Sequence, residues 1–169
     1  TTLQIGGSAI TATATEINLL DGVTATTTEI NYLDITTLGL TQASKAVTAD
    51  ANGVVSFDNG TIDEVTTVTS SSNAATINLR DGNVFEHDLT ENVTYTFSNP
   101  AAAGRASSFV LKVIQDSSAR TITWPGSVDW PGGTAPTLTA TNNGVDVFVF
   151  FTIDGGTTYY GFIAGQALA

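Results

Sequence analysis

Two consecutive units, residues 11–23 and 24–36, constrain this chain most, because together they form a tandem repeat. Both units follow the frame T-A-T-x-T-E-I-N-x-L-D. A short repeated unit is one local element that cannot bury its apolar side alone and has to pack against neighbours. The fold of this region therefore depends on what lies against the repeats.

Each unit predicts a short helix that begins at a threonine. Thr13 with Glu16, and Thr26 with Glu29, have the spacing of a capping box, in which the hydroxyl accepts from the N3 amide and the glutamate reaches back to the cap amide. Gly22 is expected to end the first helix. Apolar residues spaced three apart lie on one face of each helix, namely Ile17 and Leu20 in the first unit and Ile30 and Leu33 in the second.

These helices are expected to need partners. Each is about two turns long, and isolated helices shorter than roughly 12–15 residues are marginal in water. Repeat arrays generally need about three or more stacked units to be stable, whereas this chain has two. We therefore expect other copies of the chain to cover Ile17, Leu20, Ile30 and Leu33. Packing of these residues on the C-terminal part of the same chain is the alternative.

The repeat frame resembles the short tandem repeat of bacteriophage tail-fibre and other virion fibre proteins, especially those of marine phages. Residues 42–53 resemble the segment that follows such repeats, and residues 81–169 are similar to C-terminal domains of such fibres. The resemblance implies a homotrimer on the surface of the virion, with other virion proteins as partners. It does not indicate which part of the virion carries the chain, because fibre modules are widely shuffled.

Composition excludes several classes of function. The formal net charge of −11 disfavours nucleic acid, which needs basic patches, and anionic membranes. The absence of cysteine excludes disulfides and cysteine-based zinc sites. No apolar run approaches about 18 residues, so no membrane insertion is expected. Because the chain begins at Thr1 and contains no Met, we expect a processed product or a piece of a longer protein.

Beyond residue 73 the pattern changes to short apolar–polar alternations separated by turn residues. Strands are expected at residues 75–80, 83–89, 92–97, 107–115, 120–124, 137–140, 145–153 and 157–164. Asp81-Gly82 predicts a hairpin between the first two strands. Residues 145–153 form the most hydrophobic run and are expected to be buried on both faces.

The expected fold class is mainly β. An N-terminal stalk of short strand and short helix repeats, with a connector, would span residues 1–73. An antiparallel, jelly-roll-like β-sandwich would span residues 74–169, because about eight short strands with regular turns are typical of that architecture.

The sequence contains no signature of an enzyme, a metal site or a cofactor site. His87 is the single histidine and is expected to be structural or to lie at an interface, since a catalytic histidine needs a nucleophile or an orienting carboxylate. Glu86 and Asp88 share the opposite face of their strand, but they offer two of the 6–8 oxygens that calcium takes. Residues 58–63 likewise form an incomplete calcium loop.

Aromatic residues near the C-terminus suggest a possible ligand surface, made of Trp130, Asp129 and Tyr159. Exposed rings beside carboxylates are typical of sugar-binding surfaces, where the ring stacks on the sugar and the polar groups bind its hydroxyls. Trp130 is the ring most expected to be exposed. Trp124 and alternate members of residues 159–162 are expected to fill the core instead.

The sequence thus predicts a structural subunit of a bacteriophage fibre, with a trimeric stalk and a globular head. Three alternatives remain open. The head could bind a host-surface glycan or protein, the chain could decorate a capsid or tail, or it could form a non-viral extracellular filament.

Overall fold

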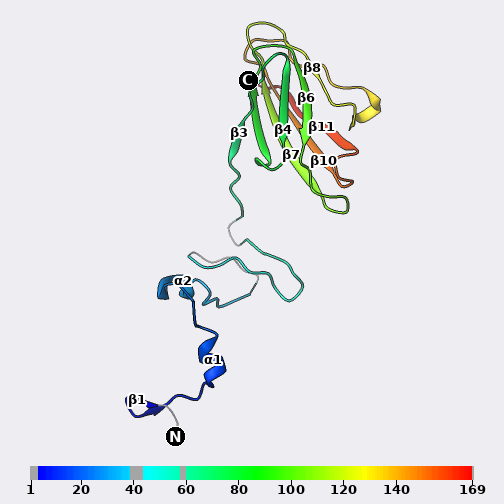
Figure 1. Ribbon diagram of the computed structural model, residues 1–169. Helices are drawn as coiled ribbons and strands as arrows, with labels where there is room; N and C mark the ends of the chain where they lie inside the picture. Colours follow the sequence, from blue (N-terminus) through cyan, green and yellow to red (C-terminus); the bar gives the residue numbers. More distant parts are fainter. Residues whose placement is uncertain (1–3, 39–43, 58–59, 169) are drawn as a thin grey trace. The chain divides into compact units, whose positions relative to one another are not determined.

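The computed structural model describes residues 4–38, 44–57 and 60–168. The protein is mainly β, as predicted, with 35% of residues in strands and 8% in helices. It divides into an N-terminal unit, Thr1–Thr61, and a C-terminal unit, Ile62–Ala169 (Figure 1). The division falls before residue 73, where the sequence analysis placed it, because β3 (Val65–Thr67) pairs with a strand of the C-terminal unit.

The described part of the N-terminal unit contains four short elements. A hairpin of β1 (Gln4–Ile5) and β2 (Ser8–Ala9) precedes two helices, α1 (Ala14–Asn18) and α2 (Thr27–Asn31). Each helix begins with the predicted capping box: the amide of the glutamate donates to the threonine hydroxyl, and the threonine amide donates to the carboxylate at 2.7 Å. Both helices are five residues long and therefore shorter than predicted.

The segments that follow the two helices differ. The first ends at Asn18 with Leu19 as its C-terminal cap, so the prediction that Gly22 caps it is wrong; Gly22 lies in the following turn with φ of +81°. After the second helix the connector folds back, and the Lys45 ammonium donates to the carbonyl of Asn31 at 2.7 Å. The amide of Ala46 donates to the carbonyl of Tyr32. The connector thus supplies donors to two carbonyls at the C-terminal end of this helix, where donors from within the helix run out.

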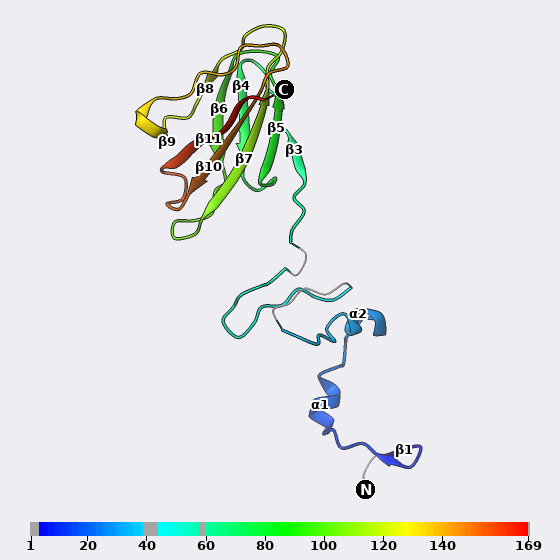
Figure 2. The same ribbon diagram turned by 180° about the vertical axis from the view of Figure 1, so that it is seen from behind.

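The C-terminal unit consists of two sheets packed face to face (Figure 2). The large sheet has six strands in the order β3, β5 (Val84–Asp88), β7 (Ser107–Ile114), β10 (Val145–Thr152), β11 (Tyr159–Leu168) and β9 (Val128–Asp129). The small sheet has the order β4 (Ala74–Asn78), β6 (Val93–Ser98) and β8 (Ile122–Thr123). A 3₁₀ turn, Pro131–Gly133, follows β9.

Strand pairing differs from the antiparallel, jelly-roll-like prediction. From β3 to β8 successive strands alternate between the sheets, and neighbours within each sheet are parallel. Antiparallel pairing in this unit is confined to β7, β10 and β11 among the named strands, while β9 joins β11 in parallel. The prediction of a hairpin at Asp81-Gly82 is wrong, because β4 and β5 lie in different sheets. Alternation along a strand shows which residues face the core, but not which strand lies alongside.

The core lies between the sheets and is largely aromatic. Phe97 of β6 makes edge contacts with Phe109 of β7 and Phe150 of β10, with ring centroids 5.0 and 5.1 Å apart. Each such pair contributes beyond the area it buries. Among the residues that the structure describes, the buried apolar ones all belong to the C-terminal unit: Val68, Ala75, Ile77, Phe85, Leu89, Val93, Tyr95, Phe109, Leu111, Val113, Trp130, Phe148, Phe150 and Tyr159.

Two further predictions about strands are wrong, and two strands were missed. Residues 137–140 form no strand, and the edge strands β3 and β9 were not predicted. The hydrophobic run in β10 is buried on one face, since Asp146, Phe148, Phe150 and Thr152 are buried while the residues between them are partly exposed. The second face of β10 is therefore an apolar surface that is only partly covered.

Candidate interaction surfaces

The four residues expected to contact other copies are exposed in the single chain. Ile17, Leu20, Ile30 and Leu33 expose between 42% and 68% of their surface. No residue of either helix is buried. The capping boxes therefore fix the start of each helix, while the apolar side chains that follow lie open.

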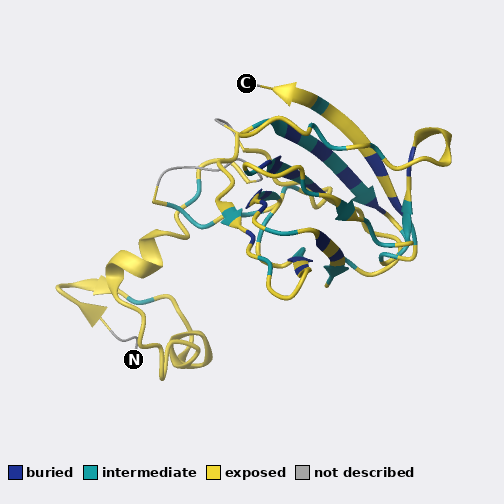
Figure 3. Ribbon diagram, turned by 90° about the horizontal axis from the view of Figure 1, so that it is seen from above, coloured by how far each residue is buried: buried dark blue, intermediate teal, exposed yellow. Residues whose placement is uncertain are grey.

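The lack of a core extends through the described part of the N-terminal unit. Within residues 4–38, 44–57 and 60–61 every residue is exposed or intermediate, and in Figure 3 this unit shows no buried colour. Leu19, Leu38, Val54 and Phe57 are further exposed apolar residues in it. A folded domain normally buries such side chains, because each contributes about 1.5–3 kcal/mol when it leaves water. This unit on its own has no such contribution.

A shallow hollow lies where the connector meets the second repeat. It has a volume of about 450 Å³ and is lined by Glu29, Tyr32, Leu33 and residues 44–46. Lys45 is held there by its bond to Asn31 and lies 4.0 Å from the Asp34 carboxylate. The hollow thus adds an apolar recess beside Leu33, one of the predicted contact residues.

The predicted ligand surface of Trp130, Asp129 and Tyr159 does not form as one exposed patch. Trp130, expected to be exposed, is buried: 8% of its surface is accessible. Tyr159 is buried as well, and Asp129 alone of the three is exposed. Trp130 packs on Trp124 and Phe150, with ring centroids 5.2 and 5.5 Å away.

Burial of Trp130 depends on a neighbouring glycine in β11. A Cβ added at Gly161 would lie 3.0 Å from two carbons of the Trp130 ring and 2.9 Å from Val128. This approach requires a residue without a side chain. Trp130, which follows β9, therefore packs directly on the backbone of β11 and belongs to the core.

Other aromatic rings lie close by on the outer face of the large sheet, where Tyr160 and Phe162 are exposed and Phe151 is half-buried. Phe151 of β10 stacks on Tyr160 and Phe162 of β11, with centroids 5.0 and 6.1 Å apart. A hollow of about 240 Å³ between Tyr160, Phe162 and the loop after β9 also contacts Asp129. We call Phe151, Tyr160 and Phe162 the aromatic strip. Alternation along residues 159–162 could have indicated it, since Tyr159 faces inward and Tyr160 outward.

His87 has the structural position that was expected. Its Nδ1 lies 2.6 Å from the Tyr95 hydroxyl, with both residues buried between the sheets. Burial lowers the pKa of His87, against the attraction of Asp88 and Glu91, and burial raises the pKa of Tyr95. A neutral imidazole and a neutral phenol are therefore favoured there. Neither a nucleophile nor an orienting carboxylate is among its hydrogen-bond partners in the described structure.

Glu86 and Asp88 lie on the opposite face, as predicted. Glu86 accepts a 2.6 Å hydrogen bond from Lys112 of β7, which completes an ion pair on the outer face of the large sheet. Among the residues described, no three acidic or histidine side chains gather as a metal site would require. The incomplete calcium loop at residues 58–63 lies partly outside the described residues.

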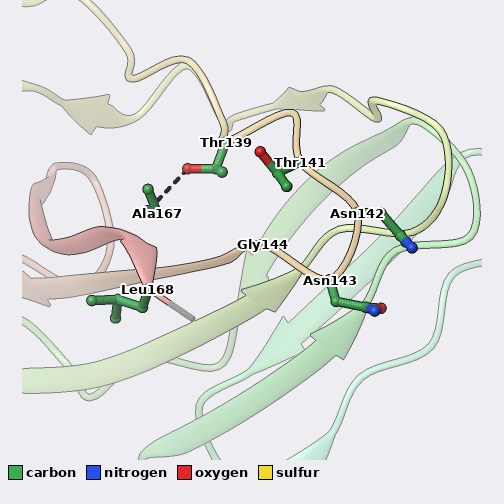
Figure 4. Close-up of a pocket in the computed structure, with 7 residues that line it drawn as sticks. All are labelled: Thr139, Thr141, Asn142, Asn143, Gly144, Ala167 and Leu168. Atoms are coloured by element: carbon green, nitrogen blue, oxygen red, sulfur yellow. Dashed lines mark hydrogen bonds between the residues drawn. The ribbon is translucent and has the colours of Figure 1, made fainter.

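A second hollow, of about 350 Å³, lies between the loop before β10 and the end of β11 (Figure 4). Its polar groups do not converge on one point: the Thr139 hydroxyl accepts from the Ala167 amide, while the side chains of Asn142 and Asn143 point away from it. The buried Asp146 carboxylate holds the same corner by accepting from the amide and hydroxyl of Thr139. The hydrogen bonds at this corner join the loop to the end of the sheet.

Comparison with known proteins gives no further assignment, since no protein family, curated protein or solved structure matches the chain. Across the residues that the structure describes, none of the helices has the length and apolar character needed to cross a membrane. The exposed apolar repeats and the outer face of the large sheet are the candidate interaction surfaces.

Proposed function

We propose that this chain is a structural subunit of a bacteriophage fibre or appendage, assembled as a homotrimer. In this proposal the N-terminal units of three copies form a stalk, and each C-terminal unit forms a head displayed on the virion. The chain acts as a spacer and display device and performs no chemistry. The virion setting and the three-fold state come from the resemblance of the repeat to those of virion fibres.

One observation carries the proposal: an N-terminal unit with two well-capped helices has no buried residue in its described part. Ordered helices of five residues are not stable alone in water. Apolar surface from sister copies would supply the burial that the single chain lacks, as it does in oligomers that have no stable folded monomer.

Charge substitutions in the repeats test this assembly. Ile17→Asp with Ile30→Asp is expected to lower the native mass from that of a trimer to that of a monomer, because an unpaired carboxylate would be buried at the contact between copies. Light scattering or native mass spectrometry on the full chain measures the change.

The matched control is Thr15→Asp with Thr28→Asp. These residues lie in the first turn of the same helices, away from the apolar pair, where a negative charge is favourable. The control variant should keep the mass of the unmodified chain. An unmodified chain that stays monomeric at high concentration, or an unchanged mass in the isoleucine variant, would refute the proposal.

The place of the chain in the particle separates the remaining structural alternatives. Cryo-electron microscopy of the virion would show density in a fibre if the proposal holds, and on the capsid or tail surface if the chain is a decoration protein. Open head-to-tail polymers of the purified chain, in place of a closed trimer, would indicate a non-viral filament.

Receptor binding by the head is the second candidate function, and the aromatic strip beside the exposed Asp129 favours it. Tyr160→Ala is the informative substitution, because the ring is 40% exposed whereas Trp130 is buried. Loss of binding to a glycan array in Tyr160→Ala, with the trimer intact, would establish this function. Absence of binding by the unmodified chain would exclude glycans on that array as ligands.

A further inference from the structure

The outer faces of the two sheets in the C-terminal unit differ in chemistry. On the small sheet the outward residues are almost all polar: Ala74, Thr76, Asn78, Thr94, Thr96, Ser98 and Thr123. That composition is normal for a face in contact with water. The small sheet therefore provides an internal reference for what a solvated face of this protein looks like.

The outward face of the large sheet, in contrast, carries a row of apolar residues. Strand register places Val65, Val84, Val110, Val149 and Phe162 side by side on β3, β5, β7, β10 and β11. None of the five is buried; Val65 exposes 55% of its surface and Phe162 exposes 46%. A continuous apolar row over five strands is the kind of patch that marks a contact with another macromolecule.

Further apolar residues widen this row on both sides. Phe151 and Tyr160 lie next to it on one side, and Ile114 and Val145 lie beyond it on the other. Between them, Lys112 and Glu86 form the 2.6 Å ion pair, so these two charges cancel. The row with these flanking residues is called the outer apolar face below.

We propose that the outer apolar face is where the C-terminal units of sister copies meet around the axis of the trimer. The proposal rests on the trimeric assembly described above and names the face that each copy contributes. The chain has a formal net charge of −11, so most of its surface would repel another copy. The row at the centre of the outer apolar face is uncharged, and this favours a second copy as its occupant. The central row of the outer apolar face presents valine and phenylalanine, and the ion pair beside it is neutral overall. The exposed Asp88 and Asp129 lie at the margin of the face, in register with Ile114 and Tyr160, so like copies meet with least repulsion at the central row.

The size of the face is consistent with a contact between tethered copies. Strands rise about 3.3 Å per residue and lie about 4.8 Å apart, so eight residues over five strands cover roughly 500–600 Å². Stable interfaces between free proteins bury about 800 Å² per partner. A smaller face suffices when the copies are already joined elsewhere, because the effective concentration rises to about the millimolar range.

A glycan is a poorer occupant of the outer apolar face. Sugar recognition requires several polar groups around the stacking ring to bind hydroxyls, as polar ligand sites generally do. Near the aromatic strip, Asp129 and the Tyr160 hydroxyl are the polar groups that the structure describes in the adjoining hollow. Beside the valine row, Asp63, Asn83 and Ser108 line a hollow of about 220 Å³. The side chains of the row itself are all apolar, so a sugar bound at these polar groups would cover only part of the row.

Single-cysteine labelling tests the proposal, because the chain contains no native cysteine. Phe162→Cys places a thiol on the outer apolar face, and Thr96→Cys places the control thiol on the exposed face of the small sheet. In the full chain, maleimide labelling of Cys at 162 is expected to be at least about tenfold slower than at 96, equivalent to about 1.4 kcal/mol of protection. In the Ile17→Asp, Ile30→Asp background the two rates should become similar.

Native mass, measured on the same samples, separates the two proposals. A trimer in which both thiols react equally fast would overturn the assignment of the face while leaving the trimeric stalk intact. A monomeric chain would overturn the trimer and the face together. Glycan binding that Phe162→Cys abolishes, with rapid labelling at 162 in the trimer, would reassign the face to a sugar.

Discussion

Single residues set how the C-terminal unit responds to acid. His87 and Tyr95 are joined by a 2.6 Å hydrogen bond between two sheets, and Trp124 stacks on Tyr95 at 5.6 Å. Burial holds the pKa of His87 below 6.5, its ordinary value. The unfolded chain therefore takes up a proton as the pH falls through 6.5, before the folded chain does.

The free energy of unfolding is accordingly expected to fall as the pH drops below 6.5. Hydrogen bonds from Arg120 and from the Thr158 amide lower the pKa values of Asp116 and Asp154 below their ordinary value of 3.8. These two groups therefore change stability only at a lower pH than His87 does. Between about pH 6.5 and 4.5, the free energy of unfolding of His87→Gln should change less with pH than that of the unmodified chain. His87→Leu should cost about 1–3 kcal/mol above pH 6.5, since the Tyr95 hydroxyl loses its partner. The cost should shrink at lower pH, because leucine does not titrate and the unmodified chain loses stability there.

Urea unfolding followed by tryptophan fluorescence over this pH range measures both effects. Trp124 and Trp130 both belong to the core region and report on its loss. A slope of stability against pH that is the same in His87→Gln and in the unmodified chain would show that another group is responsible.

At the level of elements, the repeats depend on two carboxylates. Hydrogen bonds from the backbone and then the side chains of Thr13 and Thr26 lower the pKa values of Glu16 and Glu29 below 4.5. The capping boxes are thus complete above pH 4.5 and are lost as the pH falls through the lowered values, because the neutral acid accepts more weakly.

Helicity of the N-terminal unit, and with it the assembled mass, is expected to decrease below pH 4.5. Glu16→Gln with Glu29→Gln should remove this pH dependence, since glutamine fills the same capping position without titrating. Circular dichroism and light scattering against pH test the expectation. Asp21→Asn is the matched control, because that carboxylate forms no part of either capping box. A control variant that also lost the dependence would contradict the role of the capping boxes.

At the level of the whole molecule, the two units differ in where their stability comes from. The C-terminal unit contains the entire buried apolar core of the described structure, within residues 68–159. The N-terminal unit has local hydrogen bonds and exposed apolar side chains. One unit is therefore self-sufficient, whereas the other is expected to depend on the concentration of copies.

Separate expression of the units tests this difference. Residues 62–169 are expected to unfold cooperatively as a domain of ordinary size, with a midpoint that is independent of protein concentration. Residues 1–61 should show little helix at micromolar concentration and gain it as the concentration rises. Calorimetry and circular dichroism measure the two behaviours. A cooperative, concentration-independent transition in residues 1–61 would contradict the dependence on sister copies.

Local chemistry could be predicted from the sequence, whereas pairing between distant segments could not. The capping boxes of Thr13 and Thr26, and the inward and outward alternation around His87, depend on residues within four positions of each other. The parallel pairing of β3 with β5, the burial of Trp130 on Gly161 and the apolar row across five strands depend on segments far apart in the chain. Alternation is the same for parallel and antiparallel partners, so only the tertiary structure determined which strands lie together and which apolar face they leave uncovered.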